Sequence, residues 1–307
     1  MRIYIDGSTR AAVNRMFPIW KKLGHSIVSS PKEATVQLSV VKIKNKDLPT
    51  LLRLDGVYYD LGVNYTSMNS EIAKSHAKAN AIIYQSEFSK KMCERYLLKR
   101  STKKYDVVFN GVDDWHDPKE HSGINIVSCA KWRRPKRLPE TIQVFQEFRK
   151  EYPNSILHIY GPMSTGSQKI KSENVKYYGR VDEATLKEAY KTADIYLHLC
   201  KKDSCPSSVV EAISAKVPVV TTNACGGATE MCILSKGGFV AHGEEVTTNP
   251  DYIYKDKYNR IPEVTVRTMV SFMIGIIKYK PEVILPKEMS INHTAKKYLS
   301  LMEKINR

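Results

Sequence analysis

The segment DSCPSSVVE, residues 203–211, combines residue types that could bind a phosphorylated, hydroxyl-rich ligand. Ser207 and Ser208 stand at the expected start of a helix, where free N–H groups and the positive end of the helix dipole favour phosphate. Asp203 and Glu211 flank this start, and ionised carboxylates accept strong hydrogen bonds from sugar or ribose hydroxyls. A capping aspartate and a solvent-facing glutamate would explain the same carboxylates without a ligand.

A second segment, KWRRPKR (131–137), could neutralise a diphosphate. It follows an apolar run that ends near residue 129, and Pro139 marks a plausible helix start just after it. Lys131 and Lys136 therefore belong to a strand-to-helix loop, and lysine is a good point-charge partner for phosphate oxygens. A basic loop with no ligand would show the same composition.

Short apolar runs alternate with helical patterns along the whole chain, which predicts parallel sheets covered by helices. In the first half we expect strands near 2–6, 36–43, 51–55, 81–85 and 105–109 and helices near 10–23, 67–79 and 87–99. In the second half we expect strands near 124–129, 156–160, 175–178, 194–199 and 218–222 and helices near 139–151, 182–192, 207–215, 263–278 and 288–305. Ligands of such sheets bind beyond the carboxyl ends of the strands, where both segments above lie.

The segment NGVDDWHDPKEHSG (110–123) has no periodicity and is rich in turn-forming residues, as expected of an interdomain linker. At 307 residues the chain is about twice the length of a typical domain. We therefore predict an α/β chain with two domains, a linker and a terminal helix that packs back on the first domain. The predicted boundaries are 1–112, 113–123, 124–287 and 288–307.

Three further motifs occur around these segments: NGVD (110–113), NVKYYGRV (174–181) and GGATE (226–230). Together with AKWRRPK, DSCPSSVVE and the apolar VPVV, their order and spacing resemble glycosyltransferase family 4, whose donor site contains a Gly-Arg-x4-Lys loop and two acidic residues separated by seven others. The resemblance covers about 110–240 and extends to the terminal helix. It implies the GT-B fold, with two Rossmann-like parallel-sheet domains facing across a donor-binding cleft, and transfer with retention of anomeric configuration.

The resemblance assigns the central roles to three charged residues. It implies that Lys136 contacts the diphosphate of a nucleotide sugar, that Glu211 holds the ribose hydroxyls and that Asp203 bonds hydroxyls of the transferred sugar. Asp203 replaces the glutamate that is usual in the family, and its side chain is one methylene shorter. The sugar hydroxyl that it would reach therefore stays open.

Further donor-binding positions follow from the same resemblance. Backbone N–H groups at Ser207, Ser208 and Val209 would meet the phosphates, and the backbone near Val181 would bind the base. Lys131 stands where arginine is usual, so the charge is kept but the planar bidentate geometry is lost.

The AKWRRPKR segment (130–137) also lacks two glycines that are usual in the loop of the family; Ala130 and Arg137 stand in their places.

The first domain matches the family more weakly. The family's Gly-rich loop after the first strand is represented by DGSTR (6–10), which makes Gly7 a donor-binding candidate. Asp55 and Gly56 close a predicted strand and would face the cleft, so Asp55 joins Asp203 and Lys136 as a catalytic candidate. A turn aspartate would explain Asp55 equally well.

Charge is unevenly distributed along the chain. The formal net charge is +16, and residues 1–110 hold 19 lysines and arginines against 9 aspartates and glutamates. This excess favours an anionic partner, either a phosphorylated acceptor, an acidic glycan, a membrane surface or nucleic acid. A solvated lysine-rich surface would have the same charge, and no recognised nucleic-acid module supports a nucleic-acid partner.

Six cysteines show neither a CxxC pair nor histidines at zinc-ligand spacing, so no metal site is predicted and reduced thiols in the cytoplasm are expected. The N-terminus lacks a signal-peptide pattern, and the longest apolar run, MVSFMIGII, is too short to cross a bilayer. We therefore expect a cytoplasmic protein whose contact with a membrane, if it has one, is peripheral.

We predict that a glycosyl unit passes from a UDP- or GDP-linked sugar to a hydroxyl of a glycan, lipid or protein glycan. Lys131, Lys136 and helix N–H groups would stabilise the leaving group, and no metal or other cofactor is expected. Three alternatives remain: an epimerase or phosphorylase on the same fold, a nucleic-acid-binding protein, and a relic that binds the donor without catalysis.

Overall fold

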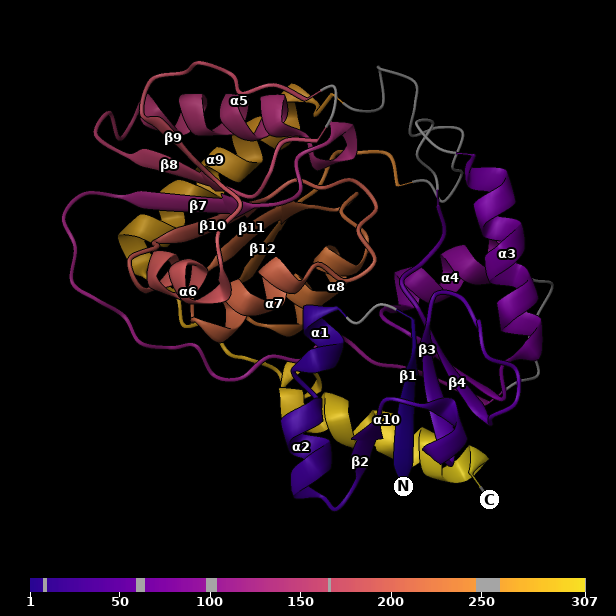
Figure 1. Cartoon of the computed structure of the whole chain (residues 1–307). Coiled ribbons are helices and arrows are strands. Elements are labelled where there is room, and N and C mark those ends of the chain that lie inside the picture. Colours follow the sequence, from indigo (N-terminus) through magenta and orange to yellow (C-terminus); the bar gives the residue numbers. More distant parts are fainter. Residues whose placement is uncertain (8–9, 59–63, 98–103, 165–166, 247–259, 307) are drawn as a thin grey trace. The chain divides into compact units, whose positions relative to one another are not determined.

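The computed structural model divides the chain into two compact units, Met1–Asp113 with Lys287–Arg307 and Asp114–Pro286 (Figure 1). It describes residues 1–307 except 8–9, 59–63, 98–103, 165–166, 247–259 and 307. Two residues of the DGSTR loop, 8 and 9, and the end of the helix expected near 87–99 lie outside the described residues.

Six parallel strands form one sheet within the described part of the first unit, in the order β2-β1-β3-β4-β5-β6. The strands are β1 Arg2–Asp6, β2 Ser26–Val28, β3 Val36–Val40, β4 Thr50–Leu54, β5 Ala81–Tyr84 and β6 Lys104–Val107. The α-helices are α1 Ala11–Asn14, α2 Phe17–Lys22, α3 Tyr65–Lys78, α4 Glu87–Tyr96 and α10 Ile291–Ile305, and a 3-10 turn, η1, spans Pro31–Glu33.

Helices cover both faces of this sheet, which explains why β4 and β5 are buried along their whole length. On one face, Trp20 of α2 packs with Tyr298 and Met302 of α10 against β-strand residues. Trp20 Nε1 also donates a hydrogen bond to the Ala295 carbonyl oxygen, at 3.0 Å. On the other face, Ile72 of α3 and Cys93 of α4 belong to a separate apolar cluster. The C-terminal helix is thus part of the core of the first unit.

The NGVD motif connects to α10 within this unit. The amide of Val112 donates to the Met289 carbonyl oxygen at 3.1 Å, and the amide of Ile291 donates back to Val112 at 3.0 Å. Gly111 permits this approach, because a Cβ there would lie 2.6 Å from Thr294 Oγ1. A larger residue at position 111 would push the start of α10 away from the chain.

Six parallel strands also form the sheet of the second unit, as far as it is described, in the order β12-β11-β10-β7-β8-β9. The strands are β7 Asn125–Cys129, β8 Ile156–Tyr160, β9 Val175–Gly179, β10 Ile195–His198, β11 Val219–Thr222 and β12 Gly238–Ala241. The α-helices are α5 Leu138–Arg149, α6 Glu183–Lys191, α7 Ser207–Ser214, α8 Gly227–Leu234 and α9 Glu263–Tyr279, and the 3-10 turns are η2 Arg134–Lys136 and, in the first unit, η5 Lys287–Met289.

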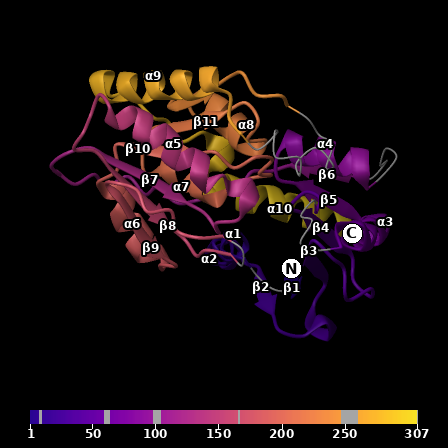
Figure 2. The same ribbon diagram turned by 90° about the horizontal axis from the view of Figure 1, so that it is seen from above.

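Helices α5 and α9 lie side by side on one face of the second sheet (Figure 2). Their apolar residues, among them Phe145, Phe148 and Met273, pack with alternate strand residues in one core cluster. On the opposite face, Tyr190 of α6 contacts Tyr196 of β10, with ring centroids 5.8 Å apart. The prediction of two α/β units with parallel sheets is confirmed.

Some expected elements differ from those observed. The prediction of a single helix near 10–23 was wrong, because the chain forms two helices, α1 and α2, with a break before Phe17. Pro18 has no N–H to continue a helix but fits the first turn of a new one. Strands β2 and β12 and helix α8 were not predicted. No described helix has the length and apolar character that a membrane crossing requires.

Candidate active site

A cavity of about 430 Å³ opens in the second unit beyond the carboxyl ends of four neighbouring strands. The strand order reverses between β10 and β7, and open parallel sheets bind ligands at such a switch point. The lining residues come from the segments that follow these strands and from α6 and α7. They are Cys129, Ala130, Lys131, Lys136, Gly161, Pro162, Arg180, Val181, Leu186, Asp203, Pro206, Ser207, Ser208 and Glu211.

The loop after β7 is fixed by its contacts with the loop after β8. Trp132 is buried, and its backbone N–H donates to the Pro162 carbonyl oxygen at 2.9 Å while Nε1 donates to that of Tyr160 at 2.8 Å. Gly161 adopts a φ of +98°, and a Cβ there would lie 1.9 Å from the Ala130 carbonyl oxygen. The two loops can therefore approach this closely only because position 161 is glycine.

Lys136 and Asp203 form an ion pair at the cavity wall. Lys136 closes η2, and its Nζ contacts Asp203 Oδ2; the two side chains are 15% and 17% exposed. Burial of Asp203 opposes ionisation, but the Lys136 ammonium outweighs it and holds the pKa of Asp203 at about 2. The Asp203 carbonyl oxygen accepts from the amide of Gly227 at 2.7 Å, which ties the loop to α8. The cavity thus contains a permanently ionised carboxylate.

Helix α7 begins at the cavity with Ser207 and has no side-chain cap. Ser207 and Ser208 line the cavity, so the positive end of the helix dipole lies at the cavity wall. Glu211 also lines the cavity and is 6% exposed, whereas Val209 is fully buried and is not a lining residue. The backbone N–H of Val209 donates to the Pro206 carbonyl oxygen at 3.1 Å.

Two further cations face the cavity. Lys131 and Arg180 are exposed lining residues, and neither has an ion-pair partner among the residues that the structure describes. Val181, expected from the sequence, does line the cavity, whereas Arg180 directly before it was not expected. Arg180 could have been identified from the sequence. It is a basic residue at the carboxyl end of a predicted strand, and it belongs to the NVKYYGRV motif already associated with the site.

Arg137 stands where the Gly-Arg-x4-Lys loop of glycosyltransferase family 4 has a glycine. Its φ of +55° lies in the left-handed region that favours glycine. Its guanidinium is buried and forms a bidentate pair with Glu244, at 2.9 Å and 2.5 Å. This pair anchors the loop that carries Lys136 and offsets the backbone strain of a non-glycine residue.

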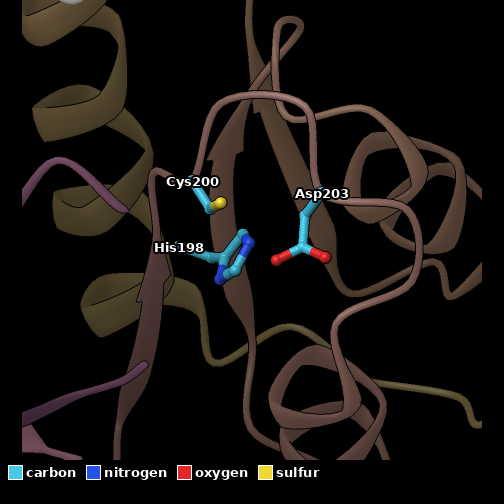
Figure 3. Close-up of side chains that lie close together, drawn as sticks. All are labelled: His198, Cys200 and Asp203. Atoms are coloured by element: carbon cyan, nitrogen blue, oxygen red, sulfur yellow. The ribbon is translucent and has the colours of Figure 1, made fainter. Parts of the chain in front are cut away.

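Near Asp203, two more side chains could bind a metal. His198 and Cys200 are each 3% exposed, and their ligand atoms lie within 4.8 Å of each other and of the Asp203 carboxylate (Figure 3). Burial lowers the pKa of His198 to about 4 and raises that of Cys200 to about 12, so both are neutral near pH 7.

The two candidates from the first unit are not lining residues of this cavity. Asp55 follows β4 and contacts Arg10, Arg53 and Gln85, all of which belong to its own unit. Gly7 adopts a φ of +113°, with nothing within 4 Å of an added Cβ. Asp55 is thus held by charged and polar side chains of its own unit, and its catalytic role stays a prediction. Gly7 has a backbone conformation that other residues rarely adopt.

Residues 114–254 match the model of a protein family described as "Glycosyl transferases group 1". All residues that line the cavity fall within this segment. No curated protein sequence matches the chain.

Several solved structures have the same fold at low sequence identity. HepE of Anabaena in complex with UDP and glucose is 12% identical, with a TM-score of 0.64 over 98% of this chain and 99% of that one. Sucrose-phosphate synthase from Thermosynechococcus elongatus is 10% identical, with a TM-score of 0.60 over 94% and 75%. The pneumococcal O-GlcNAc transferase GtfA in complex with UDP and GlcNAc is 12% identical, with a TM-score of 0.60 over 95% and 60%. The GT-B fold expected from the sequence is confirmed.

Proposed function

We propose that this chain, a glycosyltransferase by its group 1 segment and its GT-B fold, transfers a sugar from a UDP-sugar to a hydroxyl acceptor with retention. The observation that carries the proposal is the composition of the cavity in the second unit. Three cationic side chains, Lys131, Lys136 and Arg180, line it together with the start of α7 and two carboxylates.

The cations and the helix start suit a diphosphate. A nucleotide sugar leaves as a nucleoside diphosphate, whose charge grows as the glycosidic bond breaks, and fixed cations stabilise that change best in a partly buried site. Lys136 is paired with Asp203, and a diphosphate in the cavity would compete for its ammonium. Lys131 and Arg180 supply further charge, so the proposed transfer requires no metal ion.

The carboxylates suit the two sugars of the donor. Glu211 lies inside α7 and accepts hydrogen bonds from the ribose hydroxyls, while Asp203 lies before the helix and accepts them from the transferred sugar. The backbone at Val181 binds the base. A volume of about 430 Å³ falls within the range of small-ligand pockets.

The comparisons support uracil as the base. Structures with this fold carry UDP, UDP-glucose, or UDP together with glucose or GlcNAc. In the proposed reaction the bond between the sugar C1 and the phosphate oxygen breaks, a bond from C1 to the acceptor oxygen forms, and the hydroxyl proton leaves with UDP or passes to solvent.

The first test is a screen of UDP-, GDP- and ADP-sugars for thermal stabilisation of the protein, followed by an assay for donor hydrolysis. We expect UDP-sugars to raise Tm and to release UDP slowly without an acceptor. A ligand present at 100 times its Kd adds about 2.7 kcal/mol to the free energy of unfolding, which is readily measured as a shift in Tm. If no nucleotide sugar or nucleoside diphosphate raises Tm, the proposal is wrong; a changed sugar in free UDP-sugar would indicate an epimerase.

A further inference from the structure

A second chemical feature lies at the end of β10, beside the proposed donor site. His198, Cys200 and Asp203 present a nitrogen, a sulfur and an oxygen ligand atom, all within 4.8 Å of one another. Figure 3 shows the imidazole ring of His198 and the carboxylate of Asp203 facing each other, with the sulfur of Cys200 beside them. Three residues of a strand end and its following loop thus converge on one point.

One nitrogen of the buried His198 imidazole lacks a hydrogen-bond partner among the described residues. Its Nε2 atom is inaccessible to solvent and has no hydrogen-bond partner among the residues that the structure describes. Buried polar atoms in folded proteins are almost always hydrogen-bonded or bound to a metal, because an unpaired one costs free energy. A bound group in contact with Nε2 would remove this cost.

We propose that His198, Cys200 and Asp203 bind a thiophilic divalent cation, preferably Zn²⁺, through Nε2, Sγ and one carboxylate oxygen. Imidazole, thiolate and carboxylate are the ligands that zinc uses in proteins, whereas magnesium and calcium select oxygen. Ligand atoms around a tetrahedral zinc ion lie roughly 3.5 Å apart, so small rotations of Cys200 and Asp203 would close the site. Water would take the fourth position.

The charge balance also favours such an ion. Binding releases the thiol proton of Cys200 to solvent. Zn²⁺ with the resulting thiolate and one carboxylate is neutral, which a buried position tolerates. Lys136 contacts Asp203 Oδ2, so the ion would bind the other carboxylate oxygen or displace the ammonium. In either case the metal and Lys136 draw on the negative charge of the same carboxylate, and this competition weakens the binding of each.

This competition couples the metal to the donor, a step that rests on the proposed function. If Asp203 bonds the transferred sugar, an ion on its carboxylate weakens binding of UDP-glucose much more than binding of UDP. Zn²⁺ would then inhibit the enzyme reversibly by occupying a sugar-binding residue.

The direct test is a titration of the reduced, chelator-treated full chain with Co²⁺, which reports thiolate ligation by a charge-transfer band. We expect one equivalent of Co²⁺ to produce the band and Zn²⁺ to displace it. Cys200→Ser should abolish the band, and His198→Phe should weaken Co²⁺ binding at least tenfold, since even changes behind metal ligands cost about 10- to 100-fold. Cys232→Ser, a change at a buried thiol on α8, is the matched control and should keep the band.

The inference is overturned if the wild-type chain gives no cobalt–thiolate band, or if the band persists in Cys200→Ser. Circular dichroism verifies the fold of each variant, and Cys200→Ala replaces Cys200→Ser if the latter does not fold. Because metal binding is measured without nucleotide, its failure is distinct from failure of UDP-sugars to bind. Zn²⁺ should also raise the Kd of UDP-glucose in the wild type but not in His198→Phe, and an equal rise in both contradicts the coupling.

Discussion

The pairing of Lys136 with Asp203 keeps two opposite charges at the wall of the cavity. In the proposed function the ammonium binds the diphosphate and the carboxylate binds the transferred sugar. The ammonium lowers the pKa of Asp203 to about 2 although burial acts in the opposite direction. Binding of a diphosphate would replace one partner of the ammonium by another without leaving it unpaired. Removing the lysine, in contrast, leaves a largely buried carboxylate without its cation.

We therefore expect Lys136→Met to weaken binding of UDP by about 10- to 100-fold, because a charge-assisted contact with phosphate is lost. The free energy of unfolding should also fall by about 2 kcal/mol, because Asp203 loses its partner. Calorimetric titration and urea unfolding measure the two effects. Lys150→Met is the control, since Lys150 is 69% exposed and pairs with Glu147 on the surface of α5. Equal UDP affinity in Lys136→Met and the control would contradict a phosphate role.

Single residues show how much of the site could be predicted from sequence. Asp203 and Glu211 were recognisable because they flank a predicted helix start at a spacing that resembles the donor site of glycosyltransferase family 4. The His198–Cys200–Asp203 cluster was missed, because its spacing is not that of known zinc sites and its orphaned nitrogen is visible only in three dimensions. The left-handed backbone of Arg137 was equally hidden, since only its buried pair with Glu244 makes that conformation tolerable.

At the scale of elements, the cavity depends on the close approach of the loops after β7 and β8. Their sequences predict strands followed by loops, but the collision of a Cβ at position 161 with Ala130 follows only from the register of the two strands. The short strands β2 and β12, of three and four residues, escaped prediction because they are stabilised by pairing with β1 and β11, which their own sequences do not reveal.

Gly161→Ala should disrupt this arrangement. The new Cβ would lie 1.9 Å from the Ala130 carbonyl oxygen, so the loops must separate, and we expect a loss of about 2 to 4 kcal/mol in the free energy of unfolding together with weaker UDP binding. Gly123→Ala is a matched control, because Gly123 also has a positive φ but nothing lies within 4 Å of its Cβ. It should cost about 1 kcal/mol from backbone strain alone. Similar losses in both variants would refute the role of loop contact.

A histidine on strand β8, His158, predicts acid sensitivity. His158 bonds Tyr178 and Asn125, and burial, assisted by Lys176, lowers its pKa to about 4 from the model-peptide value of 6.5. Between these values the unfolded chain binds the proton and the folded chain does not, so the free energy of unfolding falls as the pH is lowered from 6.5 to 4. His198 contributes in the same window.

Replacing His158 by glutamine keeps hydrogen-bonding capacity but removes this titration. Thermal unfolding measured from pH 7 to pH 4 should therefore show a smaller decrease of Tm for His158→Gln than for the wild type. His116→Gln, at an exposed histidine of the same unit, serves as the control and should follow the wild-type curve. Identical curves for the wild type and His158→Gln would show that His158 does not titrate in this way.

At the scale of the whole molecule, the cavity and the family match coincide in the second unit. Residues 114–254 contain the complete lining of the cavity, and the sequence resemblance was strongest over nearly the same range. The sequence of the first unit predicted its site residues less well, because loop sequences vary and an aspartate such as Asp55 can equally well pair with neighbours of its own unit, as it does with Arg10 and Arg53. The anionic partner suggested by its basic charge stays a prediction.

The central claim, that the cavity of the second unit binds a UDP-sugar, is tested most directly by calorimetric titration of UDP-glucose into the wild type, Glu211→Ala and Glu151→Ala. Glu211 is a buried lining residue, whereas Glu151 is exposed on the same unit. We predict saturable binding to the wild type, an unchanged Kd for Glu151→Ala and a Kd raised by about tenfold or more for Glu211→Ala, because the ribose hydroxyls lose a charged acceptor. Equal affinity in all three proteins, or no binding to the wild type, would contradict the account.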